Sequence, residues 1–127
     1  MIATGEEIVL TPFGKMVRRS RDEQNKSLKE MAIQLGVPSS YLSAIEHGQK
    51  KVSGKIVDAT YRFFGDMGPS REEWQRLAED SPTHVKIDLT SADDLEREVY
   101  LAVGRKFKSM PLRVKQEIRD LLKDDDD

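Results

Sequence analysis

Ser27 to Gly48 is the part of this sequence that most constrains the fold. Ser27 and Glu30 have the spacing of a capping box, in which each side chain accepts the other residue's backbone amide, so a helix is expected to begin here. Gly36 is expected to end that helix, because glycine takes the positive φ that a tight turn requires. A second short helix then begins at residue 39 or 40 and ends at Gly48. The segment predicts two short helices joined by a tight turn.

Four small or apolar residues allow these two helices to pack at a steep angle. Ala32 lets the helices approach closely, and Val37 fills the corner beside the turn. Leu42 and Ile45, three residues apart, anchor the second helix to the interior. The opposite face of the second helix is left free. This combination meets the requirements of a helix-turn-helix that reads DNA.

The sequence on either side of this pair predicts further helices. Thr11-Pro12 has the pattern of an N-cap followed by the first helical residue, and that helix is expected to run to about Glu23. Ser53 is expected to cap another helix with a strongly apolar face. The segment 65–69 holds three helix-breaking residues and predicts a domain boundary. Residues 10–65 are therefore expected to form a domain of four or five helices.

The second half of the sequence predicts a small, mostly helical region over residues 70–123. Three signals for the start of a helix lie at Ser70, Ser91 and Pro111. The segment 83–89 alternates polar and apolar residues and predicts one short strand, with its apolar face formed by Val85, Ile87 and Leu89. A lone strand leaves backbone groups unpaired, so it needs a partner. Either this strand is expected to pair with that of a second copy of the chain, or the last two helices are expected to pack between the two copies. Residues 124–127 are all aspartate and predict an acidic tail.

The charges are distributed unevenly along the chain. Residues 1–65 carry ten Lys or Arg and seven Asp or Glu, a net charge of +3. Residues 66–127 carry eleven Lys or Arg and sixteen Asp or Glu, a net charge of −5. A basic first half beside an acidic second half fits a DNA-binding head with a separate acidic body.

Several classes of protein are excluded by what the sequence lacks. Cysteine is absent, and His47 and His84 have no paired carboxylates at metal-ligand spacing, so neither a metal nor a cofactor is expected. The sequence holds no glycine-rich phosphate loop and no nucleophile-elbow motif, so an enzyme is not expected. No apolar stretch approaches the roughly 20 residues that span a membrane, and the first ten residues lack a signal-peptide pattern. A cytoplasmic protein of a bacterium or a phage is expected.

The stretch from Phe13 to Phe64 resembles the phage-repressor-like (Xre-type) helix-turn-helix family, most clearly in the residues LKEMAIQLGVPSSYLSAIEHGQKKV. The diagnostic positions are Ala32, Gly36, Leu42, Ile45, Glu46 and Gly48. The resemblance implies a lambda-repressor-like bundle, followed here by the small helical region with one strand. It also implies a structural salt bridge between Arg21 and Glu46.

The resemblance further implies that the second helix of the pair enters the major groove of DNA. The side chains expected to face base edges are those of Ser39, Ser40, Tyr41, Ser43 and Ala44. The side chains expected to contact phosphates are those of Ser27, Lys29, His47, Lys50, Lys51 and Lys55. Related repressors often carry glutamines at the positions of Ser39, Ser40 and Ala44, and serine discriminates weakly between bases. Shape readout is therefore expected to contribute to sequence selection.

The sequence thus predicts a transcriptional regulator, most simply a repressor, that binds a palindromic double-stranded DNA operator as a homodimer. One alternative is an antitoxin or antiactivator whose region 70–123 binds a protein partner, with DNA binding serving autoregulation. A second alternative is a ligand-sensing repressor, although residues 70–123 are few for enclosing a ligand cavity. A membrane partner is not expected.

Overall fold

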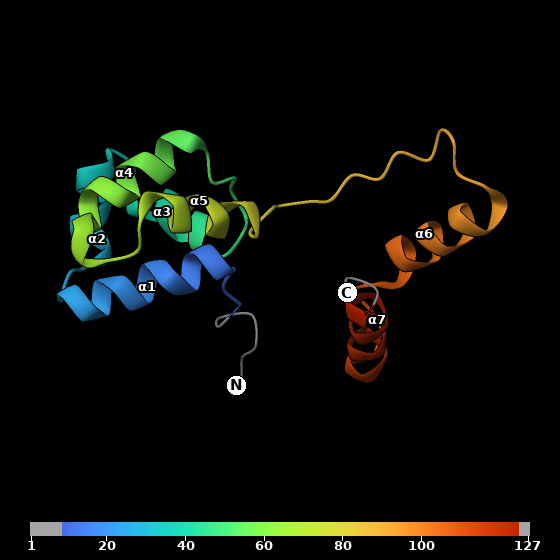
Figure 1. Ribbon diagram of the computed structural model, residues 1–127. Helices are drawn as coiled ribbons and strands as arrows, with labels where there is room; N and C mark the ends of the chain where they lie inside the picture. The colour runs from blue at the N-terminus through green and yellow to red at the C-terminus, as the bar shows by residue number, and fades with distance from the viewer. Residues whose placement is uncertain (1–8, 125–127) are drawn as a thin grey trace. The chain divides into compact units, whose positions relative to one another are not determined.

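The computed structural model describes residues 9–124, which form helices and connecting segments (Figure 1). The helices are α1 (Pro12–Gln24), α2 (Leu28–Leu35), α3 (Ser39–Glu46), α4 (Gly54–Phe64), the 3₁₀ turn η2 (Gly65–Met67), α5 (Arg71–Glu79), α6 (Asp94–Lys106) and α7 (Leu112–Asp124). The chain divides into two compact units, Met1–Val85 and Lys86–Asp127. Residues 125–127 of the predicted acidic tail lie outside the described residues, and Asp124 is the last residue of α7.

The first unit is a bundle of α1 to α5 around one apolar core (Figure 1). Its fully or almost fully buried apolar side chains are those of Phe13, Val17, Met31, Ala32, Leu42, Ile45, Ile56, Val57, Phe64 and Trp74. The predicted helical bundle is thereby confirmed. Every helix of the bundle contributes at least one of these side chains, so the position of each helix depends on the others.

The helix ends of this unit follow from local chemistry. Thr11 caps α1 by accepting the Gly14 amide at 3.0 Å, and Pro12 follows as the first helical residue. Asn25 ends α1 in the left-handed region, with φ of 56°. Gly36 ends α2 with φ of 73°, the conformation for which glycine was expected there.

The turn at 65–69, where we expected a domain boundary, lies inside the first unit because α5 packs back onto the bundle. The Trp74 ring stacks on Phe64 at 5.6 Å between centroids and meets Phe13 edge-on at 5.4 Å. The hydroxyl of Ser81, just after α5, accepts the Phe13 amide at 2.9 Å. Helix-breaking residues mark a turn in the chain but do not determine what the next helix packs against. The unit therefore extends well beyond residue 65.

Gly14 brings α1 and α3 into close contact. A Cβ atom at this position would lie 2.1 Å from the backbone oxygen of Glu46, far inside van der Waals distance. The same oxygen accepts the Thr11 amide at 3.1 Å. Only glycine lets the first turn of α1 lie directly against the end of α3.

The second unit contains α6 and α7. Asp93 caps α6 and forms a capping box with Glu96. The N-cap of α6 therefore lies two residues after Ser91, where it was expected. Both Asp93 and Glu96 provide carboxylates that accept the other's backbone amide, at 2.7 and 2.9 Å. Carboxylates near the positive end of a helix are favoured.

The strand expected over 83–89 does not form within the described residues. Its residues run without regular structure from the end of the first unit toward α6, and Val85 and Ile87 are exposed. The carboxylate of Asp88 instead accepts the amide and hydroxyl of Thr90, which lowers the pKa of Asp88. Alternation alone does not make a strand, because each ladder hydrogen bond needs a second strand, and no other described residue lies in a strand.

Candidate nucleic-acid interface

The α2–turn–α3 segment has one face packed on the core and one face toward solvent. The Val37 amide donates to the carbonyl of Ala32 at 3.0 Å, which closes the turn after α2. Leu42 and Ile45 of α3 are completely buried, so they fix the helix against the bundle. The side chains of α3 that do not face the core are therefore presented together on its other side.

The predicted base-reading residues of α3 differ in exposure. Ser39, Ser40 and Tyr41 in the first turn are exposed, and Ser43 and Ala44 in the next turn are partly buried. Pro38 stands at the N-cap and provides no side-chain hydrogen bond to the helix. The first turn of α3 thus presents two serines and a tyrosine to solvent and has no side-chain cap.

The predicted phosphate-binding residues lie at the start of α2 and in the residues that follow α3. The side chains of Ser27, Lys29, Lys50, Lys51 and Lys55 are exposed. His47 is partly buried, and its ring Nδ1 lies 2.9 Å from the Ser43 carbonyl oxygen. Because a carbonyl only accepts, Nδ1 carries the hydrogen in this arrangement, and Nε2 is the atom left for an outside partner.

The start of α2 also carries a negative charge. The Glu30 carboxylate accepts the Ser27 amide at 2.8 Å, and the Ser27 hydroxyl oxygen accepts the Glu30 amide at 3.0 Å. These hydrogen bonds lower the pKa of Glu30, so its carboxylate remains ionised at neutral pH. Glu30 therefore occupies part of the helix N-terminus that would otherwise be open to a phosphate.

Glu46 joins α3 to α1 through two arginines. Its completely buried carboxylate lies 2.5 Å from Arg21 Nη1, the pair implied by the family resemblance, and 3.1 Å from Arg18 Nε. Arg21 is itself buried and also approaches the sulfur of Met31 at 3.8 Å. Arg18 was not expected in this ion pair, although it stands three residues before Arg21 and so shares its face of α1.

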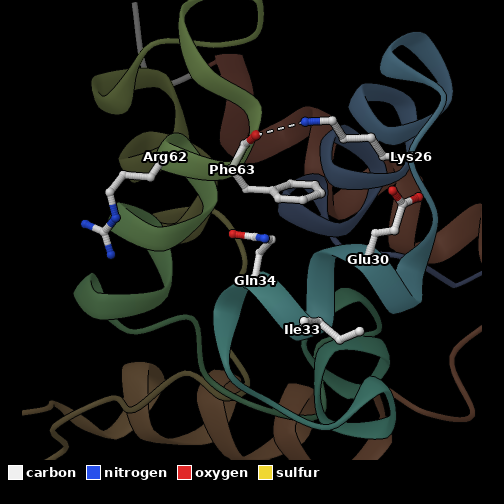
Figure 2. Close-up of a pocket in the computed structure, with 6 residues that line it drawn as sticks. All are labelled: Lys26, Glu30, Ile33, Gln34, Arg62 and Phe63. Carbon is white, nitrogen blue, oxygen red and sulfur yellow. Dashed lines mark hydrogen bonds between the residues drawn. The ribbon is translucent and has the colours of Figure 1, made fainter.

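A surface pocket of about 400 Å³ lies between α2 and α4, beside this interface (Figure 2). It is lined by Lys26, Glu30, Ile33, Gln34, Arg62 and Phe63. The Lys26 ammonium donates to the Phe63 carbonyl at 3.2 Å and lies 4.4 Å from the centre of the Phe63 ring. None of the predicted base-reading residues lines the pocket. Its polar groups connect the start of α2 to the end of α4.

Residues 9–124 show no group of three histidine or carboxylate side chains that could hold a metal ion. None of the helices in this range is both long and apolar enough to cross a membrane.

Comparison with known protein families matches residues 17–59 to a family described as helix-turn-helix. The matched segment is about a third of the chain, and it runs from the middle of α1 into α4, with all of α2 and α3 between. No curated protein and no solved structure matches the chain.

Proposed function

We propose that this protein is a sequence-specific, DNA-binding transcriptional repressor, because residues 17–59 match a helix-turn-helix family of the Xre or lambda-repressor-like kind. The family supports DNA binding and transcriptional regulation. Repression, dimerisation and the individual contacts are our proposal. A protein with this role acts in the cytoplasm of a bacterium or a phage-infected cell.

The main observation behind the proposal is that α3 has one buried face and an exposed first turn. Its inner face is locked by Leu42, Ile45 and Glu46, all of them fully buried. Its first turn presents Ser39, Ser40 and Tyr41 to solvent. A helix of eight residues held this rigidly, with its N-terminal turn outward, has the geometry of a helix whose first residues enter the major groove.

Two regions of basic and polar side chains flank this helix and suit a DNA backbone on either side of the groove. Lys50 and Lys51 follow α3, and Lys55 lies in the first turn of α4. Ser27 and Lys29 lie at the start of α2. Phosphate contacts of this kind fix the register of the protein on DNA and supply affinity that falls with salt.

A single α3 covers only a few base pairs, so we propose that two copies bind a palindromic operator. Two recognition helices about 34 Å apart reach successive major grooves on one side of the duplex. The gain in affinity and specificity from the second half-site is the physical reason for a dimer.

Substituting Ser39, Ser40 and Ala44 together with glutamine is expected to change which DNA sequence is bound. Glutamine makes paired hydrogen bonds with adenine, whereas serine and alanine select bases weakly, so the variant should prefer different bases at about 1–3 kcal/mol per position. Selection of bound sequences from a random pool, with wild type and variant in parallel, measures this. An unchanged preference with unchanged affinity would show that α3 does not face the bases.

Replacing Lys50 and Lys51 with alanine is expected to weaken binding to all DNA sequences about equally. Each lost phosphate contact should reduce the slope of log K against log salt by about one. Fluorescence anisotropy at several salt concentrations gives both quantities. Lys123 and Lys115 in α7 provide a matched control, because their replacement removes the same charge far along the chain from α3. An equal loss in the control would contradict a local phosphate contact.

A second candidate function is an antitoxin or antiactivator whose C-terminal region binds a protein partner. The observation that favours it is the amount of exposed apolar surface on α6 and α7, including Leu95, Phe107 and Leu121. In that case a purified partner would bind residues 86–124 and compete with self-association, while DNA binding by the first unit would serve autoregulation.

A further inference from the structure

Helix α6 presents a continuous apolar ridge to solvent. Leu95, Val99, Val103 and Phe107 are spaced four residues apart along the helix and its C-cap, and so lie along one side of it. Leu95 is 67% exposed and Phe107 is 52% exposed. Every side chain from residue 94 to 106 is exposed, so α7 does not cover this ridge within the unit.

A helix of this kind is not stable without a partner. Isolated helices shorter than about 12–15 residues are marginal in water, and most helical stability in proteins comes from packing of an apolar face. α6 has 13 residues and is supported by its capping box, its end charges and the hydrogen bond from Arg97 to the Leu89 carbonyl. Its ridge is therefore expected to be buried in the functional assembly.

The order of charges along α6 indicates what covers the ridge. The N-terminal half carries Asp94, Glu96 and Glu98 with a single Arg97, and the C-terminal end carries Arg105, Lys106 and Lys108. Such an order also favours the helix itself through its dipole. This order of charges also affects pairing with α6 of a second copy. A parallel α6 would place like charges side by side, whereas an antiparallel α6 would place opposite charges side by side.

The apolar residues have the same internal symmetry. About Leu101 as the midpoint, Leu95 lies opposite Phe107 and Val99 lies opposite Val103 in an antiparallel pair. The same register places Glu96 opposite Lys106. It also places Arg97 opposite Arg105, although Arg97 donates to the Leu89 carbonyl at 2.9 Å. The apolar ridge and the Glu96–Lys106 pair of α6 are thus complementary to the same helix reversed.

We propose that α6 binds α6 of a second copy of the chain in antiparallel orientation, with the midpoint of each helix near Leu101. The proposal rests on the homodimer of the proposed function and specifies the surface that forms it. It replaces a pairing through residues 83–89, which have no strand structure in the described chain. The two α6 helices would bury the 95–99–103–107 ridge of each copy.

Cysteine cross-linking tests the orientation directly, because the natural chain has no cysteine. Full-length Leu95→Cys, carrying an affinity tag, is mixed with untagged full-length Phe107→Cys under mild oxidation. An antiparallel pair gives a mixed disulfide dimer in several-fold excess over either variant oxidised alone. Leu101→Cys is the matched control, since residue 101 lies on the side of α6 away from the ridge and should cross-link poorly. Efficient self-linkage of Leu95→Cys would overturn the proposal in favour of a parallel pair.

Charge reversal gives an independent measurement on the full chain without cysteine. Glu96→Lys and Lys106→Glu, each alone, should raise the Kd of the dimer about tenfold in analytical ultracentrifugation, because two attractive pairs per dimer become repulsive. The double variant should restore the wild-type Kd. Glu96→Lys also removes the Asp93–Glu96 capping box, which a change at Lys106 cannot restore, so rescue of the Kd can come only from the 96–106 pairing. A Lys106→Glu variant with an unchanged Kd would overturn the antiparallel register. A wild-type chain that is monomeric at micromolar concentration would overturn it too.

These measurements use no DNA, so they separate this proposal from the proposed function. Rescue of the dimer in a protein that binds no DNA would leave the α6 pairing intact and contradict the regulator. A chain that binds DNA but fails both the cross-linking and the charge-reversal test would support the regulator and contradict the α6 pairing.

Discussion

Replacing Glu46 with alanine is expected to destabilise the first unit by about 3–5 kcal/mol, because the change leaves the buried Arg21 guanidinium without its carboxylate. Removing one partner of a buried ion pair costs more than the pair contributes, since the remaining charge stays out of water. Glu46 is completely buried, and its carboxylate connects α3 to two arginines of α1. Chemical denaturation followed by far-UV circular dichroism measures the loss.

The matched control for this prediction is Arg18→Ala. Arg18 contacts the same carboxylate, but its side chain is 43% exposed, so its loss should cost under about 1 kcal/mol. The loss of Glu46 is also expected to weaken DNA binding, because α3 would no longer be fixed to α1. A Glu46→Ala variant as stable as Arg18→Ala would contradict the role that the burial of this carboxylate implies.

Replacing Trp74 with alanine is expected to cost about 3–5 kcal/mol in the free energy of unfolding of the first unit. The indole is completely buried between Phe13 and Phe64, so its removal leaves a large cavity in a core that can only partly collapse. The effect should appear in the α1–α4 bundle itself, with loss of DNA binding on mild heating.

Trp74→Phe is the control that keeps an aromatic ring in this place. The indole Nε1 is buried without a hydrogen-bond partner in the protein, so phenylalanine removes an unpaired polar group while it loses some volume. We expect a cost below about 1.5 kcal/mol. Both variants lack the only tryptophan of the chain, so circular dichroism must replace fluorescence. If Trp74→Ala left the unfolding of the bundle unchanged, α5 would not belong to the functional core.

Much of the first unit could be predicted from local sequence signals. The cap at Thr11, the capping box at Ser27 and the turn at Gly36 all depend on residues within four positions of one another. Such interactions depend only on short stretches of sequence, so hydrophobic periodicity and the residue types typical of helix caps suffice to predict them.

The contacts that were missed join residues far apart in the chain. Nothing near Gly14 indicates that the oxygen of Glu46 lies where a Cβ would be, and nothing near Trp74 indicates Phe13. The strand over 83–89 was predicted for the same reason: alternation is local, while the hydrogen bonds that make a strand are not. At the candidate interface, the family pattern predicted which residues belong to the helix that faces DNA. The exposed fraction of each of their side chains could be obtained only from the folded bundle.

The hydrogen bond between the Phe13 amide and the Ser81 hydroxyl has a consequence for protein synthesis. It joins residues 68 positions apart, and the Trp74 ring closes the same core nearby. A chain emerging from the ribosome exposes α1 to α4 before residues 74–81 are available to complete that core. The helix-turn-helix domain therefore completes its folding only after residues 74–81 have been synthesised. A chain truncated after α4 would contain α3 but would lack part of the core that stabilises it.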